Sequence, residues 1–320
     1  MVSSQLLTLK MKITMNSQFK IAGGLLAVVL APGAALGCAC GCGVFDVATS
    51  SMFPESSGGM AFLSYAYQDQ NQNWNGTSTA PAANNNDKKI ETDFATIGLQ
   101  YMFNRSWGAE IELPYDYRNY KGVDDAGNPV NRRWESLGDI RLEAVYTGFS
   151  EDLSSGLTLG LKLPTGSDNR FADVVDRDTQ IGTGSTDILF GGFHRARFGQ
   201  SHWNWFGQVN LDVPVIKEGD YRPGLEVDGA AGIYYDGFSV GRVRISPIAQ
   251  VIASWRGRDN GTAADAENSG YQRVLLSPGI EFHMHPFIFY ADAEVPVYQN
   301  FTGNQLAAPV LFKVSVSFMF

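Results

Sequence analysis

The sequence predicts an all-β protein, a transmembrane antiparallel up-and-down β-barrel of about twelve strands that follows a cleaved signal peptide. Three observations support this prediction. The chain opens with a basic and then apolar segment, apolar and polar residues alternate along most of the remainder, and the connections alternate between short and long. No later segment approaches the ~18 consecutive apolar residues of a membrane-spanning helix, so a mature chain in a membrane must cross it as strands.

Residues 1–37 have the layout of a signal peptide. They contain three lysines and no acidic residue, 21–36 is uncharged, and Ala35-Leu36-Gly37 places small residues before a cleavage site. A membrane-spanning helix is the alternative, but glycine and proline interrupt the apolar stretch, which is shorter than the ~20 residues that a span needs. Cleavage changes the formal net charge from −9 to −12, because three positive charges leave with the segment. Such an acidic chain argues against nucleic acid as a partner.

Residues 38–57 form a segment between the signal peptide and the first strand, and they include all three cysteines, Cys38, Cys40 and Cys42. We expect this segment on the periplasmic side, either as a linker or folded into the lumen as a plug. The sequence leaves several roles open for the cysteines: lipidation of Cys38, one disulfide with a remaining thiol, or metal binding. Free thiols need protection or a metal ion in an oxidising compartment.

The barrel is expected over residues 58–320. The predicted strands cover 58–68, 90–104, 106–119, 134–149, 154–165, 183–197, 202–216, 224–235, 238–256, 269–284, 286–299 and 306–320. Most exceed the ~9–11 residues of a tilted transmembrane strand. Tight turns are expected at 104–107, 151–155, 199–202, 236–237 and 285–286, and long polar loops at 69–89, 120–133, 166–182, 216–223, 257–268 and 299–305. Short turns on the periplasmic side and long loops outside are typical of bacterial outer-membrane barrels.

The last strand illustrates the two faces of the predicted wall. Phe312, Val314 and Phe318 fall on one face, whereas Lys313 and the serines that follow it fall on the other. A soluble barrel would need its charged faces in water, and the export signal and sorted loops would then be coincidences. We expect this strand to close the barrel against the first one near 60–67, with Phe320 as the terminal signal for the barrel-assembly machinery. Aromatic residues near strand ends suit interfacial girdles: Tyr115, Tyr117, Trp134, Trp203, Trp205, Trp255 and Tyr298.

A short proline motif recurs near the predicted outer ends of four strands. Its copies are Glu112-Leu-Pro-Tyr115, Lys162-Leu-Pro-Thr165, Asp212-Val-Pro-Val215 and Glu294-Val-Pro-Val297. Proline removes a ladder donor and therefore belongs at strand ends, bulges or bends. We interpret the four copies as a structural rim where strand pairing ends, and a substrate-binding ring is the functional alternative.

Two further segments carry a family resemblance. At Leu163-Pro-Thr-Gly-Ser167 and Gly182-Thr-Gly-Ser-Thr-Asp187 the chain resembles the outer-membrane transporters associated with phenol-degradation operons. The layout of the barrel agrees with that family, and the specific motifs lie within about 160–195. The resemblance implies transport of small solutes, aromatic or other organic compounds among them. The cysteine-rich start departs from the family pattern.

Many charged residues fall on the predicted lumenal face. They are Glu110, Glu112, Asp116, Asp139, Arg141, Glu143, Lys162, Asp187, Asp212, Glu226, Asp228, Arg242, Arg244, Arg273, Glu281, Asp292, Glu294 and Lys313. They can cross-link and stiffen a narrow barrel, or they can line a channel and select solutes. Arg242 and Arg244, two apart on one expected strand face, are the first candidates for an anion-attracting patch.

The histidines suggest the second class of function, a structural or metal-handling barrel. His283 and His285 fall at a predicted periplasmic end, where Cys38, Cys40 and Cys42 would also lie, and thiolates with imidazoles can bind copper or zinc. No haem, phosphate-loop or cofactor motif is present, so we expect no cofactor. We expect a non-enzymatic channel in the bacterial outer membrane, since an active site would need a base beside a nucleophile or acid.

Overall fold

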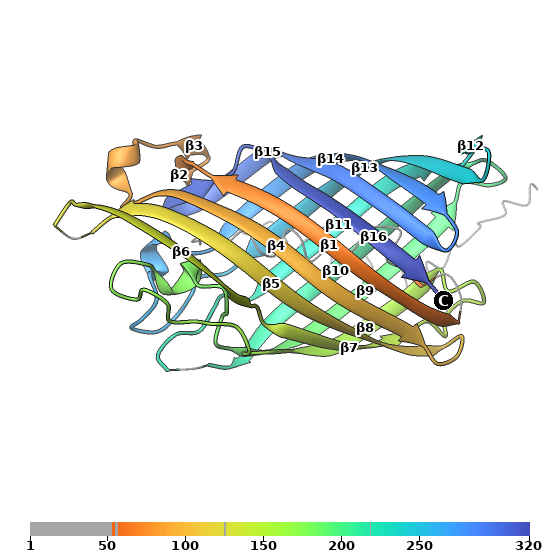
Figure 1. Cartoon of the computed structure of the whole chain (residues 1–320), viewed down its shortest axis with the longest axis horizontal. Coiled ribbons are helices and arrows are strands. Elements are labelled where there is room, and N and C mark those ends of the chain that lie inside the picture. The colour runs from red at the N-terminus through yellow and green to blue at the C-terminus, as the bar shows by residue number, and fades with distance from the viewer. Residues whose placement is uncertain (1–52, 55–56, 125, 218) are drawn as a thin grey trace, which may run out of the picture. The chain divides into compact units, whose positions relative to one another are not determined.

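The computed structural model describes residues 53–54, 57–124, 126–217 and 219–320. The predicted signal peptide and the three cysteines lie outside these residues. The described part forms a closed, antiparallel barrel of twelve wall strands, as predicted (Figure 1). Among the described residues, no helix is both long and apolar enough to cross a membrane.

The elements follow one another around the barrel. In chain order they are β1 (Gly58–Gln70), β2 (Gln72–Gly76), β3 (Ser78–Thr79), η5 (Ala82–Asn84), β4 (Asp87–Met102), β5 (Trp107–Val123), β6 (Pro129–Leu137), β7 (Ile140–Tyr146), β8 (Ser155–Leu163), η6 (Arg177–Thr179), β9 (Thr186–Arg197), β10 (Trp203–Ile216), β11 (Glu226–Tyr235), β12 (Phe238–Val240), β13 (Val243–Arg256), η7 (Ala266–Asn268), β14 (Tyr271–Met284), β15 (Phe287–Ala307) and β16 (Leu311–Met319). Two wall strands are interrupted: β6 and β7 both pair with β5, and β11 and β12 both pair with β13.

The last strand closes the barrel as predicted. β16 pairs antiparallel with β1 from Met60↔Met319 to Tyr67↔Phe312. Its two faces differ in exposure: Phe312, Val314 and Phe318 are 41–46% exposed, whereas Lys313, Ser315 and Ser317 are 1–7% exposed. The apolar side chains therefore face outward, as lipid requires, and the polar ones face the lumen.

Four connections differ from the sequence prediction, and in one of them, the loop expected at 69–89, the chain forms the short strands β2 and β3. Residues 120–133 and 299–305 were expected as loops, but β5, β6 and β15 continue through most of them. These extensions form a tall part of the wall at the long-loop end, on the left of Figure 1. Outward residues such as Lys121 and Arg133 are polar here, so the alternation of apolar and polar residues fades although the strands persist.

The fourth difference concerns the turn expected at 236–237. β12 continues the hairpin past this point, and the chain turns at Gly241 and Arg242, between the paired residues Val240 and Val243. Gly241 has a φ of 63°, which a two-residue hairpin turn requires and which glycine adopts without strain. Gly237 instead lies at the break between β11 and β12.

The proline rim is a set of interruptions in the wall. Pro114 lies where the partner of β5 changes from β7 to β6, and Pro164 directly follows the end of β8. Pro214 and Pro296 lie at register shifts of the β10–β9 and β14–β15 pairs. All four lie at strand ends or ladder irregularities, which supports the structural interpretation of the motif.

The outer face carries the aromatic residues expected of interfacial girdles, with one exception. Tyr115, Trp203, Trp255 and Tyr298 are 39–47% exposed. Trp134, which was also predicted for a girdle, is buried inside the barrel and packs with Ile90, Tyr120, Val175, Ile181 and Leu306. Even-numbered residues of β6 face the lumen, so the prediction that placed Trp134 in a girdle from its residue type alone was wrong.

Candidate functional site

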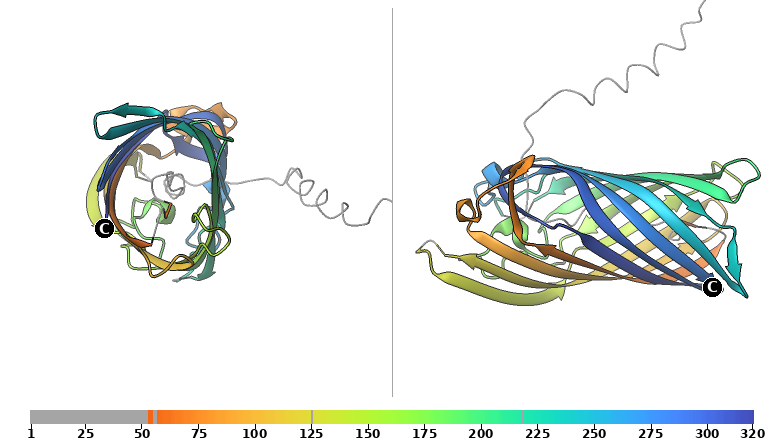
Figure 2. Two further views of the ribbon diagram at one scale, coloured as in Figure 1. Left: turned by 90° about the vertical axis from the view of Figure 1, so that its right-hand side faces the viewer. Right: turned by 90° about the horizontal axis from the view of Figure 1, so that it is seen from above.

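A cavity of about 240 Å³ lies inside the barrel. Side chains from β4, β5 and β7–β11 line most of its wall, and the connection between β8 and β9, residues 164–185, contributes from within the lumen. We call this connection the inward loop. Figure 2 shows it inside the ring of strands, in green, when the barrel is viewed along its axis.

Carboxylates outnumber cations on the described lining of this cavity, ten to five. The acidic residues are Glu110, Glu112, Asp116, Asp139, Glu143, Asp178, Asp187, Asp212, Glu226 and Asp228, and the basic residues are Arg141, Lys162, Arg177, Arg256 and Lys313. A lining of this composition creates a negative potential in the lumen, strengthened by the low-dielectric lipid around the barrel.

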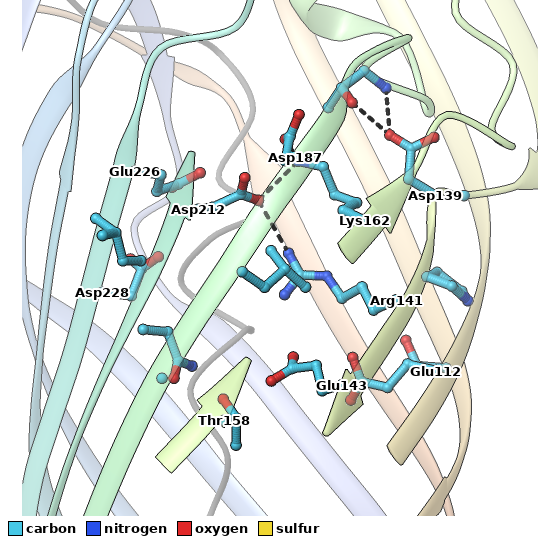
Figure 3. Close-up of a pocket in the computed structure, with 18 of the residues that line it drawn as sticks. Glu112, Asp139, Arg141, Glu143, Thr158, Lys162, Asp187, Asp212, Glu226 and Asp228 are labelled. Carbon is cyan, nitrogen blue, oxygen red and sulfur yellow. Dashed lines mark hydrogen bonds and ion pairs between the residues drawn. The ribbon is translucent and has the colours of Figure 1, made fainter. Parts of the chain in front are cut away.

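Lys162 is the centre of an ion-pair network on one side of the cavity (Figure 3). Its Nζ lies 2.8 Å from an Asp212 oxygen and also contacts Asp187, and Arg141 reaches the same Asp212 oxygen at 3.6 Å. The register explains this proximity, because Arg141, Lys162 and Asp187 are successive cross-strand partners on β7, β8 and β9. These buried charges are compensated and hold four neighbouring strands together, β7 to β10.

The opposite arrangement holds on β5 and β7, where carboxylates face one another. Glu110 and Glu143 are cross-strand partners, and Glu112 lies two residues from Glu110 on the same face, opposite Arg141 of β7. Gln100 of β4 donates a hydrogen bond to Glu110 at 2.6 Å. We call Glu110, Glu112 and Glu143 the carboxylate wall.

The inward loop narrows the outer end of the lumen. Asp139, between β6 and β7, accepts hydrogen bonds from both ends of the loop, and Arg118 of β5 donates to Thr179 O and, at 3.1 Å, to Gln180 O. The loop's Val175 and Ile181 pack on the apolar cluster around Tyr120. The loop therefore has both polar and apolar support inside the barrel.

Phe53 narrows the inner end. Its ring stacks on Phe193 with centroids 4.6 Å apart and meets Phe206 edge-on at 6.1 Å. Ile248 and Tyr290 complete the buried cluster, and Arg195 Nη2 donates to Pro54 O at 3.0 Å. The described part of the N-terminal segment thus lies within the lumen.

The predicted site residues separate into groups. Glu110, Glu112, Asp116, Lys162 and Asp212 line the cavity together. Asp292, Glu294 and Arg273 are buried in the β14–β15 part of the wall, with the Arg273 guanidinium 5.8 Å from the Tyr271 ring and 5.9 Å from the Phe301 ring. Arg244 contacts His283 at the periplasmic end, and Arg242 lies in the β12–β13 turn. The expectation that Arg242 and Arg244 share one strand face is therefore wrong, because Arg244 lies on β13 whereas Arg242 lies in the turn that precedes this strand.

The histidines of the described chain have separate partners. His283 contacts Arg244 and Glu281, His194 lies 2.7 Å from Ser155 Oγ, and His202 lies 3.1 Å from Asp236. His285 lies in the β14–β15 turn. Within the described ranges, no group of three or more metal-ligating side chains is assembled. Metal binding by Cys38, Cys40 and Cys42 stays a prediction, because they lie outside these ranges.

Sequence analysis missed several contributors to the site, including Asp178 and Arg256 on the cavity lining. Arg118 lies two residues after Asp116 on β5 and therefore on the same, lumenal face, so the alternation along the strand could have identified it. Arg177 lies within a loop, where strand periodicity carries no information. Phe53 precedes the first strand, and nothing in its neighbourhood along the chain indicates that Phe193 and Phe206 would surround it.

Comparisons with known proteins support the fold. No protein-family model matches the chain, and no curated protein matches its sequence. Among solved structures, the COG4313 outer-membrane channel from Pseudomonas putida F1 superposes with a TM-score of 0.60 at 12% identity, over 86% of this chain and 100% of that one. The β-domain of the Bordetella autotransporter BrkA gives a TM-score of 0.52 at 13% identity, over 83% of this chain and 100% of that one. With its closed wall and apolar exterior, the chain is an outer-membrane β-barrel and lies in the bacterial outer membrane.

Proposed function

We propose that the protein is a narrow outer-membrane channel that passes small solutes and favours cations over anions. The observation that supports this proposal is the cavity inside the closed barrel, whose described lining carries twice as many carboxylates as cations. Charged pore linings select ions by sign, and a lumen surrounded by lipid concentrates the potential of its lining.

The excess negative charge belongs mainly to the carboxylate wall. Lys162 offsets the charges of Asp187 and Asp212 together with Arg141, the one cation of the described lining on β7, which lies opposite Glu112. A permeating cation therefore meets net negative charge along β5 and β7. This replaces the earlier expectation of an anion-attracting patch, because Arg244 lies at the periplasmic end with His283.

The solute is proposed to be small and to include organic compounds with an apolar part. Both ends of the lumen are narrowed, at the outer end by the inward loop and at the inner end by Phe53. Aromatic side chains there offer favourable contacts to an apolar or aromatic solute. The sequence resemblance to transporters of phenol-degradation operons points to the same class. We propose residues 38–57 as a plug, with Phe53 as its anchor, and the C-terminal strand with Phe320 as the signal for the barrel-assembly machinery.

Single-channel recording in planar bilayers tests the proposal. Purified protein should give discrete ion conduction, and the reversal potential in a KCl gradient should show preference for K⁺. The triple variant Glu110→Gln, Glu112→Gln, Glu143→Gln should move the permeability ratio several-fold toward unity, because it removes the carboxylate wall. The matched control is Glu91→Gln, Asp93→Asn, Glu135→Gln, which removes equal charge from outward-facing positions of β4 and β6.

Correctly folded protein that conducts no ions and admits no small solute in liposome swelling would disprove the channel. Conduction with an unchanged permeability ratio in the triple variant would leave the channel standing and reject the role of the carboxylate wall.

A further inference from the structure

The two sequence motifs that carry the family resemblance meet in space. They are the two ends of the inward loop, and the backbone N–H of Gly182 donates to Ser167 O at 2.8 Å. A Cβ atom on Gly182 would lie 2.4 Å from the carbonyl of Gly166. The two ends of the loop therefore approach each other so closely that only glycine fits at this position. The motifs thus close the base of the loop.

Asp139 binds both ends at this point. Its Oδ1 accepts from the N–H of Gly166 at 2.9 Å, and its Oδ2 accepts from the N–H and the hydroxyl of Thr183 at 2.8 and 2.6 Å. The residue is 7% exposed and lies in the short break between β6 and β7. We call these three hydrogen bonds the Asp139 clasp.

The position of Asp139 ties the loop to the barrel wall. The neighbouring Gly138 N–H donates to Pro114 O at 2.9 Å, at the point where the partner of β5 changes. Figure 3 shows Asp139 at the upper right, beside Lys162 and Asp187, with dashed lines to the loop. The clasp therefore fixes the loop base to a proline of the rim.

Further interactions hold the loop beyond its base. Arg177 binds Asp168 at 2.7 Å and Thr183 O at 2.8 Å, so it braces the loop internally. Arg118 and the apolar cluster hold the middle of the loop to the wall. If the base opens, these contacts must form without the constraint that now directs the loop inward.

We propose that Asp139 is the positioning residue that keeps the inward loop across the outer mouth and thereby sets the size limit for solutes. This inference rests on the proposed channel function. Without the carboxylate, the partly buried N–H groups of Gly166 and Thr183 lose a charged acceptor, which is costly where water cannot fully replace it. Loss of hydrogen bonds to a charged acceptor should raise the undocked-to-docked ratio of the loop roughly ten-fold or more.

The experiment compares three variants of the full chain. Asp139→Ala breaks the clasp, and a deletion variant replaces 168–181 with two glycines, which the closeness of Ser167 and Gly182 permits. The control is Asp220→Ala, because Asp220 accepts from the N–H of Thr262 at 2.9 Å and from its hydroxyl in the same manner, but on an exposed pair of outer loops. Conductance and the largest sugar admitted in liposome swelling are measured for each.

We expect the deletion variant to conduct more and admit larger sugars, Asp139→Ala to shift both readouts in the same direction, and Asp220→Ala to match the wild type. Asp139→Ala should add nothing in the deletion background, because its effect passes through the loop. A folded Asp139→Ala barrel with wild-type conductance and size limit overturns the inference, whereas absence of conduction in the wild type and the deletion variant rejects the channel itself. If Asp139→Ala does not fold, an additional effect of Asp139→Asn in the deletion background would overturn it, and no additional effect would support it.

Discussion

The outer and inner ends of the lumen are narrowed by different kinds of interaction. At the outer end, Asp139 holds the inward loop through hydrogen bonds to backbone and hydroxyl groups. At the inner end, Phe53 is held by ring contacts with Phe193 and Phe206. The strength of hydrogen bonds to a carboxylate changes when a single donor atom is replaced or when the charge nearby changes. The strength of aromatic packing changes mainly when side-chain volume is removed. The difference suggests a permanent restriction at the periplasmic end and an adjustable one outside.

The largest effect is expected from Phe53→Ala. Removal of a buried phenyl ring costs about 3–5 kcal/mol of packing free energy, here at the inner restriction. Single-channel conductance should increase, with the cation preference retained because the carboxylate wall is unchanged. Phe198→Ala is the control, since Phe198 lies in the neighbouring periplasmic turn and is 51% exposed. Equal conductance of Phe53→Ala and wild type would show that Phe53 does not restrict the path.

A smaller effect is expected from Thr183→Val at the outer end. The substitution keeps the size and the backbone N–H of the residue but removes the hydroxyl that donates to Asp139. One hydrogen bond to a charged group contributes about 1.5–3 kcal/mol. Conductance should rise less than in Asp139→Ala, and amide hydrogen exchange should accelerate within 166–183. Thr262→Val provides the comparison at Asp220. An exchange rate equal to the wild type in Thr183→Val would contradict the role of this hydroxyl.

The smallest effect is expected from pH. Desolvation at the wall, followed by the nearby carboxylates of Asp178, Asp87 and Asp265, raises the pKa of Asp176 to about 7 in the docked loop. In the undocked loop the pKa of Asp176 is about 4. The docked loop therefore binds the proton more tightly than the undocked loop does. Docking weakens as pH rises from about 4 to 7 and does not change further above pH 7. Part of the Asp176 side chain stays in contact with solvent, and solvent screening keeps the change modest.

Conductance measured between pH 4 and 8 should therefore rise through this window. The rise should be absent in Asp176→Asn, which holds no titrating carboxylate at this position. A pH profile of Asp176→Asn that is identical to the wild type would assign the dependence to another group. The restriction at Phe53 contains no comparable outer-loop carboxylate among its buried partners, so Phe53→Ala should leave the slope unchanged.

Much of the wall could be predicted because a membrane imposes a simple alternation on the strands that cross it. The pairing of β16 with β1 and the lumenal position of Glu110, Lys162 and Asp212 followed from this parity. The extensions of β5, β6 and β15 did not follow, because their outward face is polar and the alternation of apolar and polar residues fades there. The alternation of apolar and polar residues, on which the prediction depended, ends where the strands leave the lipid.

The arrangement inside the lumen was only partly predictable. Parity assigned Asp139 to the interior, but its bonds to Gly166 and Thr183 depend on how the inward loop folds. The position of Phe53 depends on contacts with residues more than a hundred positions later in the chain. Such contacts arise from tertiary packing and cannot be predicted from the local periodicity of the sequence.

The proline rim has a consequence for how this surface can change over evolutionary time. Pro114, Pro164, Pro214 and Pro296 lie where strand ends or register shifts already interrupt the wall ladder. Segments above these points can lengthen, shorten or be exchanged while the ladder below keeps its register. A cell-surface barrel faces phages and antibodies through those segments. The four prolines mark a boundary between a frame whose strand register is fixed and a region whose length can change.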